Sequence, residues 1–142
     1  MFSGIIFMEQ QQDHSFKKNE RLSDKKTITR LFASGKSFVV FPFRIIYLPN
    51  SAIGNTSDVT QIMVSVSKKR LKSAVKRNRI KRLIRESYRI NKSLLNEESQ
   101  SVNKHSWVIA FIYIDKTIHP FSVIQKSIQK ALQKMNSLSG NK

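Results

Sequence analysis

The sequence predicts an α+β fold, in which three helices pack on a single four-stranded sheet in the order α-β-β-β-α-β-α. Two observations lead to this prediction. Stretches with apolar residues at every third or fourth position alternate with short runs of β-branched and aromatic residues. The length of 142 residues and the composition, 39% hydrophobic and 25% charged, are those of one globular domain with a sizeable core.

The first helix is expected to begin at Ser23 and to end at Gly35. Ser23 is a suitable N-cap residue, and a glycine at the C′ position commonly closes a helix. Ile28, Leu31 and Phe32 lie at helical spacing, so they form one apolar face. Core packing is the ordinary role of such a face.

Three strands should follow this helix. Residues 37–41 and 43–48 are rich in β-branched and aromatic side chains, and Pro42 between them lacks the N–H that a central strand needs. The polar, glycine-containing stretch 49–60 is expected to be a loop. Residues 61–67 then alternate between two faces, with serines on one of them, which predicts a third strand with one face incompletely covered.

The segment 67–92 carries much of the chain's positive charge. Twelve basic side chains lie between Lys68 and Lys92, against one acidic side chain, Glu86. At 100° per residue, one stripe of the expected helix is apolar and contains Ile80, Ile84, Tyr88 and Leu95, flanked by Leu83 and Leu94. The opposite side holds Asn78, Arg79, Arg82, Arg85 and Arg89. This helix should therefore pack on the core through one face and present guanidinium groups on the other.

The basic face points to a nucleic-acid partner. A merely solvated helix face normally mixes both signs, because like charges three or four residues apart repel by a few tenths of a kcal/mol per pair. A polyanion relieves that repulsion, and guanidinium forks bind phosphate through two hydrogen bonds. The net charge of +17 and the pI near 10.6 also require an acidic partner.

One strand and one helix complete the predicted order. Residues 107–114 are nearly all apolar, which is typical of a central strand buried on both faces. The final helix is expected over 118–135, with Pro120 at its first position. The serine-rich stretch 96–104 between the basic helix and this strand is expected to be a surface loop.

The sequence shows no catalytic site of its own. Hydrolysis of a phosphodiester by a protein normally needs clustered carboxylates or a histidine base, and here the acids are scattered. His14, His105 and His119 fall in a tail, a loop and a helix cap. There is no cysteine, no glycine-rich phosphate loop and no long apolar segment. We therefore expect no catalysis by the isolated polypeptide, no cofactor or metal bound by it, and no membrane association.

The motif VSVSKKRLKSAVKRNRIKRLIRESYR, residues 64–89, resembles the centre of the bacterial ribonuclease P protein subunit. In that family a strand ending in SVSKK leads to a helix opening A-x-x-R-N-R-x-K-R-x-x-R. The resemblance extends over about residues 16–135 and predicts a domain at 16–136 with flexible ends at 1–15 and 137–142. It implies a ribosomal protein S5 domain 2-like fold with a left-handed βαβ crossover, although such crossovers are right-handed in nearly all proteins.

The resemblance also implies a function. In ribonuclease P the RNA subunit carries the active site and its Mg²⁺ ions, and the protein subunit helps bind precursor tRNA, whose 5′ leader is removed hydrolytically to give the mature 5′ end. By this resemblance the chain is a cytoplasmic RNA-binding subunit whose partners are the catalytic RNA and precursor tRNA, with no protein partner evident. The residues expected to contact the catalytic RNA are Arg77, Asn78, Arg79, Lys81, Arg82, Arg85 and Arg89.

A second RNA surface is expected where the family has a cleft for the single-stranded leader, between the first helix and the sheet. The matching residues are Ile28, Phe32, Tyr47, Lys68 and Lys69. A register slip of one residue exchanges Tyr47 for Ile46 on the cleft face. The family often has an aromatic residue at the position of Ile28, and Phe32 is either a base-stacking platform or a core residue.

Two other functions compete with this interpretation. Many ribosomal proteins are small, basic and α+β, so a structural RNA-binding protein is the main alternative. A DNA-binding regulator is weaker, because no helix-turn-helix pair precedes the basic helix.

Overall fold

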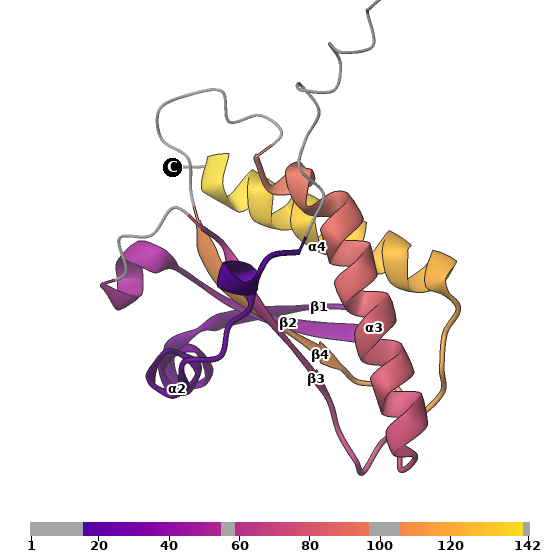
Figure 1. The fold of residues 1–142 in the computed structure, drawn as a ribbon. Helices are drawn as coiled ribbons and strands as arrows, with labels where there is room; N and C mark the ends of the chain where they lie inside the picture. The colour runs from indigo at the N-terminus through magenta and orange to yellow at the C-terminus, as the bar shows by residue number, and fades with distance from the viewer. Residues whose placement is uncertain (1–15, 55–58, 97–105, 141–142) are drawn as a thin grey trace, which may run out of the picture.

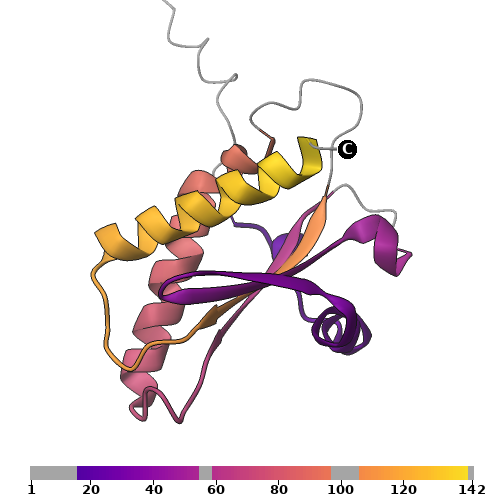
Figure 2. The same ribbon diagram turned by 180° about the vertical axis from the view of Figure 1, so that it is seen from behind.

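In the computed structural model, which describes residues 16–54, 59–96 and 106–140, a four-stranded sheet separates one short helix from two longer ones (Figures 1 and 2). The strands are β1 (Lys36–Val40), β2 (Phe43–Pro49), β3 (Gln61–Val66) and β4 (Trp107–Tyr113). The α-helices are α2 (Lys25–Ser34), α3 (Ala74–Asn91) and α4 (Phe121–Gly140). Short 3₁₀ turns lie at η1 (Lys18–Glu20), η2 (Asn50–Ile53) and η3 (Lys92–Asn96).

The sheet has the strand order β1-β2-β4-β3, so the last strand in the chain lies inside it. β2 pairs antiparallel with both β1 and β4, whereas β3 and β4 are parallel. The connection from β3 to β4 runs through α3 and is left-handed (Figures 1 and 2). The predicted fold class, the order of the elements and the central position of residues 107–114 are thus confirmed.

Each face of the sheet has its own apolar core. On one face, α3 and α4 bury the predicted stripe of α3, and Ile80 and Ile84 are completely inaccessible to solvent. Tyr88 and Leu95 belong to the same core, with Leu83 and Leu94 at its margin. On the other face, α2 packs Leu31 against Leu48, Val108 and Ala110. The helical periodicity therefore predicted the correct inward face of α3, whereas on the expected apolar face of α2 Leu31 is buried and Phe32 is exposed.

Two helix starts differ from the expectation, and α4 begins at Phe121 instead of at residue 118. Asp24, not Ser23, is the N-cap of α2, because its carboxylate accepts hydrogen bonds from the Thr27 N–H at 3.0 Å and the Thr27 hydroxyl at 2.7 Å. Pro120 precedes the first residue of α4, and its carbonyl accepts a hydrogen bond from the Val123 N–H. α4 also continues to Gly140, through residues expected in a tail.

Gly35 ends α2 as expected, but for a different physical reason. Its φ of −70° is open to every residue, so no left-handed conformation is needed. A Cβ atom at Gly35 would lie 2.4 Å from the Leu31 carbonyl oxygen and 2.7 Å from Cγ2 of Ile46. The glycine therefore permits a close approach between the end of α2 and strand β2.

Several expectations lie outside the described residues: the N-terminal extension 1–15, His14, His105 and most of the loop 96–104. In the part of the chain that is described, no helix is long and apolar enough to cross a membrane.

Candidate nucleic-acid interface

The outer face of α3 presents a row of uncompensated arginines. Ser73 caps the helix, accepting a hydrogen bond from the Lys76 N–H, and the buried stripe fixes which way the helix faces. Asn78, Arg79 and Arg82 are therefore exposed along one side. The Asn78 amide makes no hydrogen bond to any described residue, so it is available to an external ligand.

Two of the predicted RNA-binding residues are already engaged within the protein. One Nη atom of Arg77 donates to the carbonyls of Leu71 at 2.8 Å and Lys72 at 2.9 Å, so it holds the turn that leads into α3. Arg89 forms an ion pair with Glu86 one turn away. That hydrogen bond lowers the pKa of Glu86 and raises the pKa of Arg89. Because Glu86 is paired with Arg89, it does not compensate the charges of Arg79 and Arg82.

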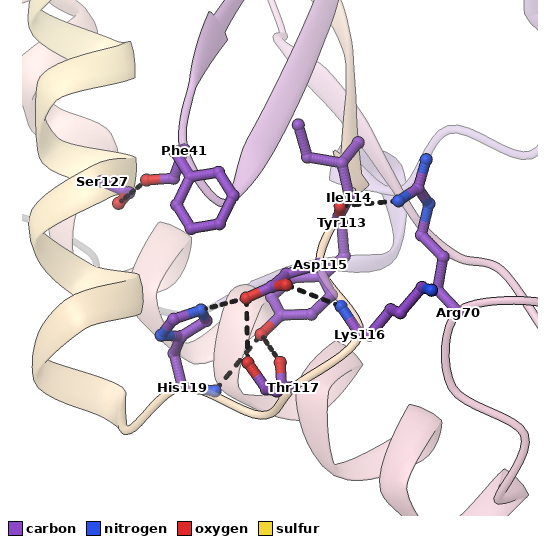
Figure 3. A network of polar contacts seen from close by, with 9 residues as sticks. All are labelled: Phe41, Arg70, Tyr113, Ile114, Asp115, Lys116, Thr117, His119 and Ser127. Atoms are coloured by element: carbon purple, nitrogen blue, oxygen red, sulfur yellow. Dashed lines mark hydrogen bonds and ion pairs between the residues drawn. The ribbon is translucent and has the colours of Figure 1, made fainter.

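The turn before α3 is also fastened to the far end of β4, as Figure 3 shows. Arg70 donates to the Ile114 carbonyl at 2.7 Å. Beyond Ile114, the carboxylate of Asp115 accepts hydrogen bonds from the Thr117 hydroxyl and the Lys116 N–H and lies against His119 Nε2 (Figure 3). The Arg70 contact positions the start of the basic helix relative to the sheet, and the Asp115 contacts hold the loop between β4 and α4.

A further arginine joins the basic surface from outside α3. The segment before α2 pairs with the edge of β3 through Arg21 and Ile62, and this brings Arg21 near Arg85. Both line a hollow of about 300 Å³ together with Phe16, whose ring lies 5.3 Å from the Arg21 guanidinium carbon. Partial burial, and then the charge of Arg21, lowers the pKa of Arg85. Sequence reasoning missed Arg21, because only the tertiary pairing places it there.

The side chains around α2 settle which cleft predictions are geometrically possible. Leu31 is completely buried, whereas Phe32 is 46% exposed and is not a core residue. Ile28 is partly buried against the core beneath α2. Phe32 is thus available to an external ligand, as a stacking platform requires.

Strand β2 presents Ile46, not Tyr47, to α2. Ile46 lies in the core beneath α2, and Tyr47 points to the opposite face, where its ring centroid is 5.6 Å from that of Trp107 and 5.7 Å from that of Phe38. The placement of Tyr47 in the cleft is therefore wrong. Since side chains alternate along a strand, the one-residue uncertainty in register is resolved in favour of Ile46.

The other cleft candidates lie at the carboxyl end of β3. Lys68 and Lys69 are both exposed, and the Lys69 N–H donates to the Ser67 hydroxyl. Arg44, which sequence reasoning did not single out, is an exposed cation on the same face of β2 as Ile46. Alternation from Ile46 was the signal that could have placed it there.

Metal ligands are not gathered anywhere in the described segments: no group of three or more His, Cys, Asp or Glu side chains could hold an ion. What the described surface offers is positive charge beside exposed apolar side chains.

Comparisons with known proteins agree with this arrangement. The sequence pattern of the family Ribonuclease P matches residues 16–136. The ribonuclease P protein component of Porphyromonas gingivalis ATCC 33277 is 41% identical over 115 residues, which cover 81% of this chain and 82% of that protein. The same component of Chlorobium phaeobacteroides is 32% identical over 126 residues, covering 84% and 86% of the two chains.

Solved structures show the same fold. The RNase P protein of Staphylococcus aureus, at 27% identity, superposes with a TM-score of 0.64 over 81% of this chain and 94% of that one. The RNase P protein of Thermotoga maritima, at 23% identity, gives a TM-score of 0.63 over 81% and 96%. With the family pattern, the relatives and the fold in agreement, this chain belongs to the bacterial ribonuclease P protein component family.

Proposed function

We propose that this chain is the cytoplasmic, RNA-binding subunit of a ribonuclease P holoenzyme and binds the catalytic RNA through the outer face of α3. The observation that carries the proposal is the exposed row Asn78, Arg79, Arg82 opposite a fully buried stripe on the same helix. A-form RNA is recognised largely through its phosphates and ribose hydroxyls, which suits arginines held in parallel on a rigid helix.

In this proposal the chemistry belongs to the RNA subunit and its Mg²⁺ ions. The described part of the chain offers no carboxylate cluster that could hold ions for hydrolysis, and its arginines are suited to binding phosphate. The protein therefore contributes affinity and positioning for leader removal, in which precursor tRNA is cleaved to give the mature 5′ end.

A triple variant, Arg79→Ala, Arg82→Ala and Arg85→Ala, tests the contact with the catalytic RNA. Each lost phosphate contact should weaken binding and reduce the slope of log K against log salt by roughly 0.7 to 0.9, so about two units in all. Filter binding at several salt concentrations measures both quantities. The matched control removes three exposed lysines elsewhere: Lys116→Ala, Lys126→Ala and Lys130→Ala. Unchanged affinity and slope in the arginine variant would contradict the assignment.

We also propose that the cleft between α2 and the sheet binds the 5′ leader of precursor tRNA. Phe32 supplies an exposed ring at the end of α2, and Lys68 and Lys69 supply charge at the end of β3. Stacking of a base on an aromatic side chain is worth about 1–3 kcal/mol. Ile28 and Ile46 are partly buried beside that ring, in the core beneath α2.

Phe32→Ala tests the leader contact in the reconstituted holoenzyme. It should weaken the binding of precursor tRNA by about 1–3 kcal/mol relative to that of mature tRNA. The protein should lose little stability, because the ring is half exposed. Phe41→Ala is the matched control, since Phe41 is 59% exposed at the β1–β2 turn. Equal weakening of both RNAs by a folded Phe32→Ala protein would remove Phe32 from the cleft.

Reconstitution separates this function from that of a structural RNA-binding protein. A mixture of this protein, its cognate catalytic RNA and Mg²⁺ alone should cleave precursor tRNA at the mature 5′ end. A ribosomal protein would not support this cleavage.

A further inference from the structure

Helix α2 covers only part of the sheet face on which it lies. Residues paired across the four strands form rows on that face, and the row through Ser37, Ile46, Ala110 and Met63 runs beneath α2. The next row, two residues further along each strand, is Val39, Arg44, Ile112 and Ser65. We call this second row the open row. Val39 is 59% exposed and Arg44 is exposed, so no helix covers them, whereas Ile112 and Ser65 are half-buried and Ile112 packs against the core beneath α2.

Arg44 is an unusual residue at the centre of such a row. It lies on β2, which is paired on both sides, and its cross-strand neighbours Val39 and Ile112 are aliphatic. No described residue forms an ion pair or a side-chain hydrogen bond with it, and the open row contains no carboxylate. The guanidinium therefore lies between two aliphatic neighbours, with Ser65 as the other polar residue of the row and with its charge uncompensated.

The surroundings of the open row select a ligand chemistry. Four strands about 4.8 Å apart make the row about 14 Å long, and its exposed part on β1 and β2 is a narrow track of the kind that an extended single strand can follow. Gly35 brings the end of α2 against Ile46, so the turn that carries Phe32 lies beside the open row. Lys68 and Lys69 follow β3 at its other margin. Apolar surface, an exposed ring and cations together are suited to single-stranded RNA.

We propose that the leader of precursor tRNA continues from Phe32 across the open row, and that Arg44 binds one of its phosphates. This inference rests on the proposed leader-binding function of the cleft and adds to it a phosphate contact on the floor of the sheet. Val39 and Ile112 flank the contact on both sides, so the guanidinium fork engages the phosphate in a less polar setting than on an open helix face.

Arg44→Gln tests the inference, because it removes the charge and retains most of the side chain's length. In the reconstituted holoenzyme, affinity for a precursor tRNA with a long leader should fall about 10-fold, and mature tRNA should bind as before. The slope of log K against log salt should decrease by roughly 0.7, the value for one contact to a single strand. Arg44→Lys should retain that slope and recover part of the affinity, since it keeps the charge and loses the fork.

A series of leader lengths locates the contact. Arg44→Gln should behave like the unaltered protein with leaders too short to pass Phe32 and lose affinity once the leader reaches the open row. Arg30→Gln is the matched control, because Arg30 is exposed on the outer surface of α2, away from the sheet. It removes the same charge and should leave the affinity for every leader unchanged.

The outcomes distinguish this inference from the function on which it rests. If Phe32→Ala weakens the binding of precursor tRNA more than that of mature tRNA and Arg44→Gln does not, the Arg44 contact is overturned, but leader binding by the cleft still holds. If neither variant changes the ratio of precursor to mature tRNA affinity, the proposal of leader binding by the cleft is wrong as a whole. If Arg44→Gln weakens both RNAs equally, or Arg30→Gln matches its effect, Arg44 acts through general charge and the inference is wrong.

Discussion

At the scale of single residues, Gly35 determines how closely α2 approaches the sheet. A methyl group there would meet the Leu31 carbonyl oxygen at 2.4 Å and Ile46 at 2.7 Å, and the first of these is backbone that cannot rotate away. Gly35→Ala should therefore destabilise the protein by about 1–3 kcal/mol in urea unfolding, the usual cost of overpacking. It should also weaken leader binding, because Ile46 lies against the end of α2 that carries Phe32.

Gly54→Ala provides the contrasting case. Gly54 has a φ of +74° with nothing within 4 Å of a Cβ atom, so its substitution meets backbone strain alone and should cost about 1–2 kcal/mol. It lies outside the cleft and should leave leader binding intact. If Gly35→Ala, in contrast, left the free energy of unfolding unchanged, the end of α2 would be free to move away from the sheet.

Asp115 gives the fold a defined dependence on pH. Its hydrogen bond with His119, and then those from Thr117 and the Lys116 N–H, hold its pKa below the ordinary value of 3.8, against the opposing effect of partial burial. A carboxyl with a depressed pKa in the folded state stabilises the fold fully above its unfolded pKa. That contribution is lost as the pH falls through the folded pKa.

Asp115→Asn should accordingly be less stable than the unaltered protein at neutral pH, and the difference should shrink as the pH is lowered below 3.8. Thermal unfolding at a series of pH values measures it. A difference that stays constant across that range would mean that the network in Figure 3 does not depend on the charge of Asp115.

At the scale of elements, α3 joins a charged outer face to an inner face that contains one unsatisfied group. The hydroxyl of Ser87 is buried with no hydrogen-bond partner among the described residues. Asn91, one turn later, is satisfied by the Ser87 carbonyl and by Gln129 of α4. Ser87→Ala should therefore raise the free energy of unfolding by about 1 kcal/mol, because an unpaired hydroxyl is removed and alanine favours the helix.

Ser87→Ala leaves the exposed arginines in place, so RNA affinity should not change. Urea unfolding and filter binding on the same preparation test both parts. A loss of stability would show that the hydroxyl makes a hydrogen bond that the described residues do not account for.

The elements also show what the sequence could and could not predict. The stripe of α3 was predictable because its apolar residues repeat at helical spacing and are flanked by charges. In β2, Ile45, Ile46 and Tyr47 are consecutive and all apolar, so alternation gave no indication of which residue faces α2. At the start of α2, Ser23 and Asp24 are both good caps, and only the geometry of the Thr27 N–H decides between them.

At the scale of the whole molecule, the sheet separates the two proposed RNA surfaces. α3 and the open row lie on opposite faces, so variants of one should not alter the other. The triple arginine variant of α3 should weaken the catalytic RNA complex and leave the ratio of precursor to mature tRNA affinity unchanged once the holoenzyme is saturated with protein. Phe32→Ala should lower the ratio of precursor to mature tRNA affinity and leave the binding of the catalytic RNA unchanged.

Combining these changes in one protein should reproduce both effects, each within about 0.5 kcal/mol of its separate value. Titrations of catalytic RNA and of the two tRNAs provide the comparison. A larger deviation would reveal coupling through the sheet, and the turn that Arg70 fastens to Ile114 is the physical connection between the two sides.

The interior place of β4 also governs how the molecule is completed during synthesis. The ribosome makes β1, β2, β3 and the cationic helix before Trp107–Tyr113, the strand that must enter between β2 and β3. Until then Ile80, Ile84 and Tyr88 have neither the complete sheet nor α4 to cover them. In a nascent chain that ends before β4, the basic residues of α3 are therefore exposed before the core beneath that helix can form. The native arrangement forms only near the end of translation.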